Sequence, residues 1–227
     1  MVDSLSIVVP AFNEELAITE VLTQILAGIP ASVGEYEVIV VDDGSTDATG
    51  ELVMNMAGSD GRIRYVRHDV NRGKGAALAS GFGRAAMEWI FFTDADLQIN
   101  ISELPAFLSY AGDYDAVIGY RTGRSDSIVR IGLSKAYGSL VSFFLGFRIM
   151  DINCPFKLFR RSVLADSQLH SRGFFVDAEL IYIILNNENR IKELGVASHP
   201  RLKGRSSVRF RHVLETLHEF FRFLREK

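Results

Sequence analysis

The chain has 227 residues, of which 48% are hydrophobic and 23% are charged, so it can bury a full core and is not expected to be disordered. The formal net charge of -3 argues against a general nucleic-acid binder, and the single cysteine excludes an internal disulfide framework or a cysteine-based zinc site. The N-terminus lacks the basic and apolar segments of a signal peptide. The longest apolar stretch, residues 136–147, is far shorter than the roughly 20 residues of a membrane span, so the chain is expected to lie on a bilayer at most.

Short apolar runs alternate with helical segments along the first half of the chain. Strands are predicted over residues 5–9, 36–41, 62–67, 89–93 and 116–120, and helices over residues 15–29, 47–57, 73–87 and 102–110, the last capped by Ser102. This alternation predicts βαβ units and a mainly parallel sheet covered by helices on both faces, which is an α/β fold.

The second half is less regular. Strands are predicted over residues 154–159 and 191–198, with a helix over 177–186. Residues 128–150 and 208–227 carry apolar side chains at helical spacing, with basic residues at their edges. No linker is evident, so we expect one domain, 1–227, that ends in a helical appendage.

Four polar loops follow predicted strands, at residues 10–14, 42–47, 93–98 and 119–121. In a parallel sheet these loops share one edge, where α/β proteins bind their ligands. One polar loop is ordinary, but four loops with acids or arginine on one edge indicate a binding site.

Asp94 and Asp96 end the apolar run that starts at Trp89. An extended backbone would point both side chains the same way, and two close carboxylates repel unless a cation lies between them. Mg²⁺ or Mn²⁺ prefers a few carboxylates together with water and phosphate oxygens. The pair therefore predicts a divalent ion that also grips a diphosphate, and Gln98 can add a further oxygen.

Two other loops allow more than one interpretation. Asp43 in the segment Asp42–Ser45 can accept hydrogen bonds from a nucleobase and from ribose hydroxyls, or the segment can be a turn in which Ser45 or Thr46 caps the next helix. The glycines of residues 71–77 open a helix whose N-terminus favours phosphate. The chain has neither the full phosphate-loop pattern nor Gly-x-Gly-x-x-Gly after its first strand, which argues against a P-loop ATPase and a dinucleotide oxidoreductase.

Together these residues resemble the family 2 glycosyltransferases, which have the GT-A fold. The matching stretches are PAFNEE, VDDGSTD, NRGKGAAL, DADLQ, GYR, DINCPFKLFRR, FFVDAEL and RLKGRSS, which cover nearly the whole chain. DINCPFKLF and the Arg-x-x-Gly-x-Ser ending favour the polyprenyl-phosphate (dolichyl-phosphate) mannosyl- and glucosyltransferases. The resemblance implies a nucleotide-sugar-binding half at 1–122, an acceptor-binding half at 123–207 and an amphipathic helix at 208–227.

The resemblance also implies residue roles. The nucleotide pocket would comprise Pro10, Phe12, Glu14, Val41, Asp43, Lys74, Asp94 and Ala95. The metal, Mn²⁺ or Mg²⁺, would be held by Asp94, Asp96 and Gln98. The catalytic set would be Asp96, the phosphate-binding Arg121, Arg130 and Arg201, and Asp177 and Glu179 near the sugar. Two departures stand out, because Ser207 replaces the usual lysine of Gly-x-Ser-Lys, and Cys154-Pro155-Phe156 replaces Cys/Ser-Gly-Phe.

The implied reaction is an inverting transfer from a nucleotide sugar, of the GDP-mannose or UDP-glucose type, to a polyprenyl phosphate. A phosphate monoester is already largely ionised at neutral pH, so no histidine base is required. The implied location is cytoplasmic and peripheral, on the cytoplasmic face of a membrane. Residues 128–150 and 208–227 would then contact lipid, although their apolar stripes can instead pack on the domain, on a second copy or on a separate membrane partner.

Two alternatives stay open. The acceptor can be a sugar or protein hydroxyl, in which case Asp177 or Glu179 would serve as general base and Arg130 and Arg201 would be dispensable. The chain can also be a non-catalytic subunit that binds a nucleotide sugar. The donor is equally open among GDP-mannose, UDP-glucose and UDP-N-acetylhexosamines.

Overall fold

A computed structural model describes residues 2–123, 128–165, 167–200 and 210–226, with only the main chain for several residues at the starts of α5 and α7. The strands are β1 (Ser4–Ala11), β2 (Glu35–Asp42), β3 (Ile63–Arg67), β4 (Trp89–Thr93), β5 (Ala116–Thr122), β6 (Phe156–Arg160) and β7 (Ile191–Ala197). The helices are α1 (Ile18–Gly28), α2 (Thr49–Ser59), α3 (Lys74–Phe82), α4 (Leu104–Leu108), α5 (Ile128–Leu145), α6 (Val176–Asn186) and α7 (Phe210–Glu226), with 3₁₀ turns η1 (Ile101–Glu103) and η2 (Arg161–Leu164).

The strands form one sheet in the order β3-β2-β1-β4-β6-β5-β7. β1 pairs in parallel with β2 and β4, and β2 with β3, whereas β6 runs antiparallel to both β4 and β5. β7 is parallel to β5. The predicted α/β fold with a mainly parallel sheet is confirmed, and β6 inserts between β4 and β5, so the strands of residues 1–122 and 123–207 share one sheet.

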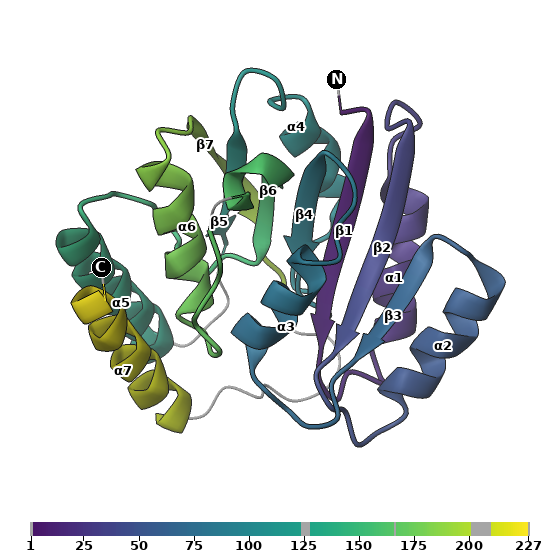
Figure 1. Cartoon of the computed structure of the whole chain (residues 1–227), viewed down its shortest axis with the longest axis horizontal. Coiled ribbons are helices and arrows are strands. Elements are labelled where there is room, and N and C mark those ends of the chain that lie inside the picture. Colours follow the sequence, from purple (N-terminus) through teal and green to yellow (C-terminus); the bar gives the residue numbers. More distant parts are fainter. Residues whose placement is uncertain (1, 124–127, 166, 201–209, 227) are drawn as a thin grey trace.

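Helices cover both faces of this sheet (Figure 1). On one face, α1, α2, η1 and α4 bury their apolar side chains against one set of alternating strand residues. On the other face, α3, α5, α6 and α7 cover the opposite set. Gly81 lets α3 approach the sheet, since a Cβ at this position would lie 2.3 Å from Val8 Cγ1. Strand side chains buried on alternate faces explain why β1, β2 and β4 read as continuous apolar runs.

Three local expectations were wrong. The helix predicted over 73–87 ends at Phe82, since the glycines at 81 and 83 disfavour its continuation. The helix predicted over 102–110 is the 3₁₀ turn η1 followed by the short α4. Its cap is Asn100, whose side chain accepts from Ser102 N at 2.9 Å.

Helix α5 and helix α7 lie side by side at one end of the molecule (Figure 1), joined by the rings of Phe144 and Phe220, whose centroids are 5.8 Å apart. Phe220 is fully buried and also contacts Phe175, so part of the α7 stripe packs on the domain. Within the described ranges, no helix is long and apolar enough to span a membrane.

Candidate active site

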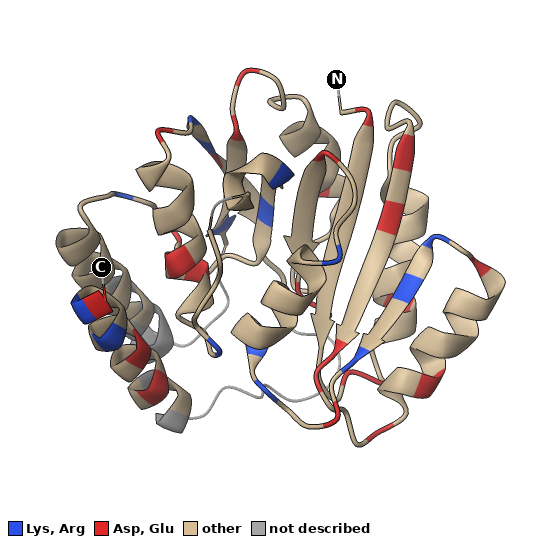
Figure 2. Cartoon of the chain, viewed as in Figure 1, with Lys and Arg blue, Asp and Glu red and all other residues tan. Residues whose placement is uncertain are grey.

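The carboxyl ends of six strands meet at one edge of the sheet, because β6 alone runs in the opposite direction. The amino end of β6 therefore brings residues 154–156 to the same edge. Figure 2 shows acidic residues along the loops that follow β1 and β2 at this edge. The topology thus collects the polar loops that the sequence singles out.

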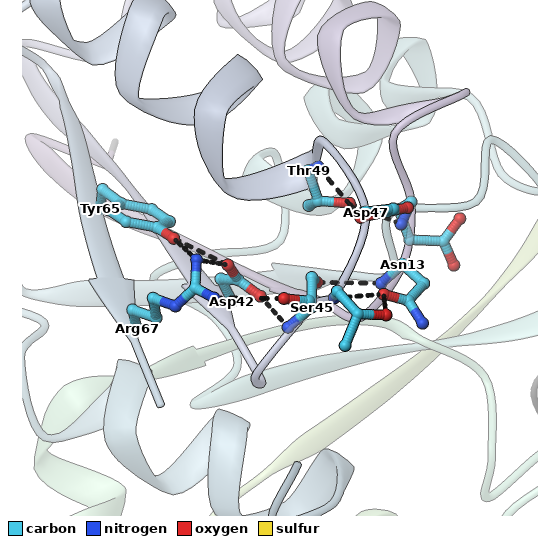
Figure 3. Close-up of polar contacts among 9 residues, drawn as sticks. Asn13, Asp42, Ser45, Asp47, Thr49, Tyr65 and Arg67 are labelled. Atoms are coloured by element: carbon cyan, nitrogen blue, oxygen red, sulfur yellow. Dashed lines mark hydrogen bonds and ion pairs between the residues drawn. The ribbon is translucent and has the colours of Figure 1, made fainter. Parts of the chain in front are cut away.

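The loops after β1 and β2 are locked together (Figure 3). Asn13, with a φ of 55°, donates its N–H to Ser45 Oγ at 2.9 Å and accepts from Thr46 N at 2.8 Å through Oδ1. Asp47 Oδ1 accepts from the N–H and the hydroxyl of Thr49 at the start of α2. Neither Ser45 nor Thr46 therefore caps α2, because both bind Asn13 and the N–H of Thr49 is bonded to Asp47.

Asp42 is the buried anchor of this arrangement. It is fully shielded from solvent and accepts hydrogen bonds from Ser45 N at 2.8 Å and from Tyr65 Oη at 2.7 Å (Figure 3). Arg67 adds an ion pair at 3.5 Å. The first acid of the Asp42-Asp43 pair is thus a structural group that holds the loop in shape.

Replacing Asp42 by Ala is expected to destabilise the fold by about 2 kcal/mol, because it leaves a buried N–H and a phenol hydroxyl without their acceptor. The measurement is chemical denaturation of the variant beside Asp3→Ala, a change at an exposed acid just before β1. Equal stability of the two variants would contradict the role assigned to Asp42.

Asp43 organises the next loop along the edge. Its carboxylate accepts from Arg72 N at 3.0 Å and Gly73 N at 2.8 Å, and lies 2.6 Å from His68 Nδ1. The other ring nitrogen of His68 lies 2.9 Å from Ser80 Oγ, so both ring nitrogens of this buried histidine have a partner. Both oxygens of Asp43 are engaged with the chain itself, and its place in the nucleotide pocket stays a prediction.

The N-terminus of α3 is already capped by the protein, which corrects the expectation of an open phosphate site there. The carbonyl of Arg172 accepts from Gly75 N at 2.7 Å and from Ala76 N at 3.3 Å. The glycines allow this close approach, since a Cβ at Gly75 would lie 2.1 Å from Ser171 O and one at Gly73 would lie 2.4 Å from Arg172 O. The glycine-rich segment thus fits the chain's own backbone.

The segment 94–98 turns away at the end of β4 instead of staying extended. Asp96 Oδ1 accepts from Gln98 N at 3.1 Å, and Leu97 has a φ of 59°. The side chain of Asp94 is 30% exposed, whereas Ala95 is buried. The two carboxylates therefore stand on a turn at the sheet edge, partly open to solvent.

A line of alternating charges runs inward from Asp94, and we call it the buried charge chain: Asp94, Lys74, Asp177 and Lys157. Lys74 Nζ lies 3.1 Å from Asp94 Oδ1 and 3.3 Å from Asp177 Oδ2. Lys157 Nζ lies 2.5 Å from Asp177 Oδ1 and donates to the carbonyl of Cys154 at 2.6 Å. The side chains of Lys157 and Asp177 are 0% and 1% exposed, so each charge depends on its partner.

Neighbouring charges favour the ionised forms of Asp177 and Lys74. Burial on its own would raise the pKa of Asp177, but Lys157 and Lys74 outweigh it and lower the pKa below the ordinary 3.8. Burial would likewise lower the pKa of Lys74, but Asp177 and Asp94 outweigh it and raise that pKa. Burial raises the pKa of the neighbouring Cys154 thiol to about 12, which agrees with a buried cysteine of no redox role.

Arg121 at the end of β5 is held by Asp151 in a two-point pair, with Nε and Nη2 lying 2.7 and 2.9 Å from its two oxygens. This pair joins the fourth polar loop, at residues 119–121, to the segment before β6. The phosphate contact expected of Arg121 stays a prediction. The side chain of Arg130 and all of Arg201 lie outside the described residues. The same holds for Ser207, which replaces the usual lysine, and for Lys203 and Arg205, which are candidates to compensate for that lysine.

Glu179 is committed to the main chain. Its two oxygens accept from His170 N at 2.8 Å and Ser171 N at 2.9 Å. Glu219 of α7 holds the next two amides, Arg172 N and Gly173 N, through Oε1. These two acids fix the segment that caps α3 beside Lys74.

The remaining residues expected in the nucleotide pocket lie at the same edge. Pro10 and Phe12 are half-buried at the end of β1, and Glu14 follows them, with its N–H donated to Thr49 Oγ1 at 2.8 Å. Val41 is fully buried under α3, so only its main chain can line a pocket. Their roles toward a nucleotide stay predictions.

The oxygen ligands at this edge suit a divalent ion whose remaining ligands come from a bound substrate. Over the ranges described, no three or more His, Cys, Asp or Glu side chains are grouped to hold a metal. Asp94 and Asp96 offer carboxylates only, and Asp94 already attracts the ammonium of Lys74. Two carboxylates with room for water and phosphate oxygens suit Mg²⁺ or Mn²⁺.

Sequence reasoning missed several residues of this site, above all Lys157, Asp151 and Glu219. Lys157 carried a signal, because a lone lysine within the apolar strand CPFKLF is almost never buried without a partner. Asp151 and Glu219 gave no such signal, since their partners come from distant segments.

Solved structures with the same architecture include glucosyl-3-phosphoglycerate synthase from Mycobacterium tuberculosis. Its complex with Mn²⁺, UDP and glucosyl-3-phosphoglycerate aligns with a TM-score of 0.73 at 19% identity, over 98% of this chain and 77% of that one. Its complex with Mn²⁺ and UDP-glucose aligns with a TM-score of 0.74 at 20% identity, over 96% and 79% of the two chains. At this identity the likeness shows the GT-A fold.

Sequence relatives extend the comparison. An undecaprenyl-phosphate 4-deoxy-4-formamido-L-arabinose transferase from Photorhabdus laumondii is 29% identical over 96% of this chain and 67% of its own length. A dodecaprenyl-phosphate galacturonate synthase from Rhizobium johnstonii is 31% identical over 98% of this chain and 68% of its own length. The chain thus spans about two thirds of these relatives. The model of glycosyl transferase family 2 matches residues 6–167, and the chain belongs to this family.

Proposed function

We propose that the chain transfers a sugar, with inversion, from a nucleotide-sugar donor to a polyprenyl phosphate. The observation that carries this proposal is the pair Asp94 and Asp96 on the turn after β4, with the ammonium of Lys74 beside it. The names of the relatives support the acceptor class, and UDP with Mn²⁺ in the structural neighbours supports the donor class.

Each charged group has a part in this reaction. A divalent ion bound by Asp94 and Asp96 would neutralise the charge that develops on the leaving diphosphate. Lys74, which is paired with Asp177, would donate to the same diphosphate. Arg121, Arg130 and Arg201 orient phosphate groups, and positioning accounts for much of the rate because the reacting atoms are brought together in line.

The engaged acids favour a phosphate acceptor over a hydroxyl. Transfer to a hydroxyl needs a general base, and Asp177 and Glu179 are the acids proposed for it. Asp177 gives each oxygen to a different lysine, and Glu179 gives both to main-chain amides. A phosphate monoester needs no base, because its second pKa of about 6 leaves it largely ionised at neutral pH.

The acceptor class is tested by offering a short-chain polyprenyl phosphate and the matching polyprenol to the protein, with Mn²⁺ and a mixture of nucleotide sugars. We expect a glycolipid from the phosphate alone, detected by mass spectrometry. A glycosylated product from the polyprenol would contradict the phosphate acceptor and indicate a hydroxyl acceptor.

The donor sugar is part of the proposal. The sequence motifs favour mannose on GDP or glucose on UDP without choosing between them, whereas the relatives' names point to formamido-arabinose and galacturonate. The donors to compare are therefore UDP-glucose, UDP-galacturonate, UDP-N-acetylglucosamine and GDP-mannose.

A lipid acceptor requires contact with a membrane surface, and α5 and α7 offer one. Phe143 is 81% exposed and Phe144 47% on α5, and Leu214 is 55% and Phe221 49% exposed on α7. Exposed aromatic side chains on adjoining helices insert readily into a bilayer interface. We propose that this surface, the α5–α7 apolar patch, rests on the membrane that holds the acceptor.

The double change Phe143→Ser and Phe221→Ser is expected to lower binding to vesicles of phosphatidylcholine and phosphatidylglycerol by about fivefold, because it removes two large apolar anchors. Co-sedimentation measures the bound fraction. The control is Leu16→Ser with Met54→Ser, which removes two exposed apolar side chains outside the patch. Equal binding by both double variants would contradict the assignment.

A further inference from the structure

The ammonium of Lys74 is paired with Asp94, the carboxylate that a metal would need as a ligand. Its Nζ lies 3.1 Å from Oδ1 and 3.4 Å from Oδ2 of Asp94, so it faces both oxygens. The side chain of Lys74 is 12% exposed and that of Asp94 30%, so the carboxylate meets solvent on its outer side and the ammonium on its inner side. A cation that approaches from solvent therefore competes with Lys74 for Asp94.

The rest of the buried charge chain keeps Lys74 in this place. Asp177 is fully buried, and Lys157 takes its Oδ1 at 2.5 Å, which leaves Oδ2 for Lys74 at 3.3 Å. Lys157 is itself fixed by the Cys154 carbonyl at 2.6 Å. If Lys74 left Asp177, a buried carboxylate oxygen would lose its counter-ion, so the ammonium is expected to stay near Asp177.

The net charge of the site determines when a metal can replace Lys74 at Asp94. The buried charge chain holds two lysines and two aspartates, so it carries no net formal charge. A divalent ion alone would leave the partly buried site positive, which is unfavourable in a medium of low dielectric constant. A divalent ion together with the two ionised phosphates of a nucleotide sugar adds no net charge.

We propose that Lys74 is a resident counter-ion of Asp94 that makes metal and donor binding depend on each other. In the resting site it neutralises Asp94 and weakens binding of the metal alone. When metal and nucleotide sugar enter together, the metal takes Asp94 and the ammonium moves to the diphosphate. This inference rests on the proposed function, and it assigns to Lys74 a role that opposes metal binding before the donor arrives.

The test is a Mn²⁺ titration followed by the electron paramagnetic resonance signal of free Mn²⁺, with and without UDP, and again with GDP. The variants are Lys74→Met and Lys74→Gln, two neutral replacements of different polarity. The control is Lys192→Met, a lysine of β7 that lies over the rings of Tyr110 and Tyr114. Thermal unfolding shows that each variant is folded.

Without nucleotide, both Lys74 variants are expected to bind Mn²⁺ about tenfold more tightly than the unmodified chain and the control. With the nucleotide diphosphate the order reverses, so the factor by which nucleotide tightens Mn²⁺ binding falls in the variants. A purely structural lysine would weaken binding in both conditions.

The inference would be overturned if, without nucleotide, the variants bound Mn²⁺ no more tightly than the unmodified chain. Failure of the proposed function is a separate result, because it is read from the unmodified chain as an absence of UDP and GDP binding in the presence of Mn²⁺ or of sugar transfer to lipid phosphate. The comparison made with Mn²⁺ alone would still decide whether Lys74 competes for Asp94.

Discussion

Replacing Asp96 by Ala is expected to lower the rate of sugar transfer by about a thousandfold. The change removes a carboxylate ligand of the metal that would neutralise the charge on the leaving diphosphate. The fold should be kept, since Asp96 lies on a turn that is partly open to solvent. Single-turnover formation of glycolipid measures the rate, and thermal unfolding measures the fold.

The matched control for this change is Asp113→Ala, which removes an exposed acid from the loop between α4 and β5. It should transfer sugar at the original rate. A rate for Asp96→Ala within about tenfold of the control would contradict a role for Asp96 in metal binding, since a tenfold change in rate corresponds to only about 1.4 kcal/mol of the barrier.

Replacing Lys157 by Met is expected to destabilise the fold by about 3 kcal/mol, because it strands a carboxylate that cannot reach water. Asp177 would keep only Lys74, and the Cys154 carbonyl would lose its donor. The free energy of unfolding from chemical denaturation at neutral pH measures the effect.

An exposed ion pair gives the comparison for Lys157. Arg62 pairs with Asp60 at the surface, and Arg62→Met should leave stability almost unchanged, because water screens such pairs. Destabilisation of the two variants by the same amount would contradict the buried charge chain as a stabilising feature. The double change Lys157→Met and Asp177→Leu replaces both charged side chains by apolar ones of similar volume. It should recover part of the stability lost in Lys157→Met.

The pH dependence of stability follows from the same pair. The pKa of Asp177 lies below its ordinary value of 3.8 in the folded chain, so its ion pairs add stability at neutral pH. This contribution begins to fall as the pH approaches 3.8 and is lost as the pH drops through the lower, folded pKa. In Lys157→Met the loss should be smaller and should end at a higher pH, because the folded pKa of the carboxylate is depressed less with one lysine fewer.

The sheet was predictable because its central strands are bare apolar runs. β1, β2 and β4 lie within one or two residues of their predicted bounds, since both faces of each are covered. Helix ends were harder to place. The end of α3 at Phe82 and the Asn100 cap depend on single side-chain and main-chain contacts that periodicity does not contain.

The position of the site was predictable, but the hydrogen bonds and ion pairs within it were not. The rule that loops at the carboxyl ends of parallel strands meet placed Asp43, Asp94 and Arg121 at one edge. It could not show that Asp43 and Glu179 bind main-chain amides, because those amides lie in loops whose course the apolar pattern does not contain. The place of Lys157 depended on β6 running antiparallel, which the apolar pattern of a strand leaves open.

The non-catalytic alternative makes a different prediction. A subunit that binds a nucleotide sugar without reacting would need no phosphate acceptor, and the ionised buried charge chain would serve nucleotide binding alone. Binding of UDP or GDP in the presence of Mn²⁺, with no turnover of any donor in the presence of lipid phosphate, would favour that alternative.

The central claim is that the chain joins a sugar from one nucleotide sugar to a polyprenyl phosphate. The most direct measurement incubates the purified protein with Mn²⁺, a short-chain polyprenyl phosphate and each of the four nucleotide sugars separately, with Asp96→Ala alongside, and identifies products by mass spectrometry. We predict a sugar–phosphate–polyprenyl product from one donor, lost in the variant. Hydrolysis of a donor without glycolipid, or no turnover of any donor, would contradict the claim.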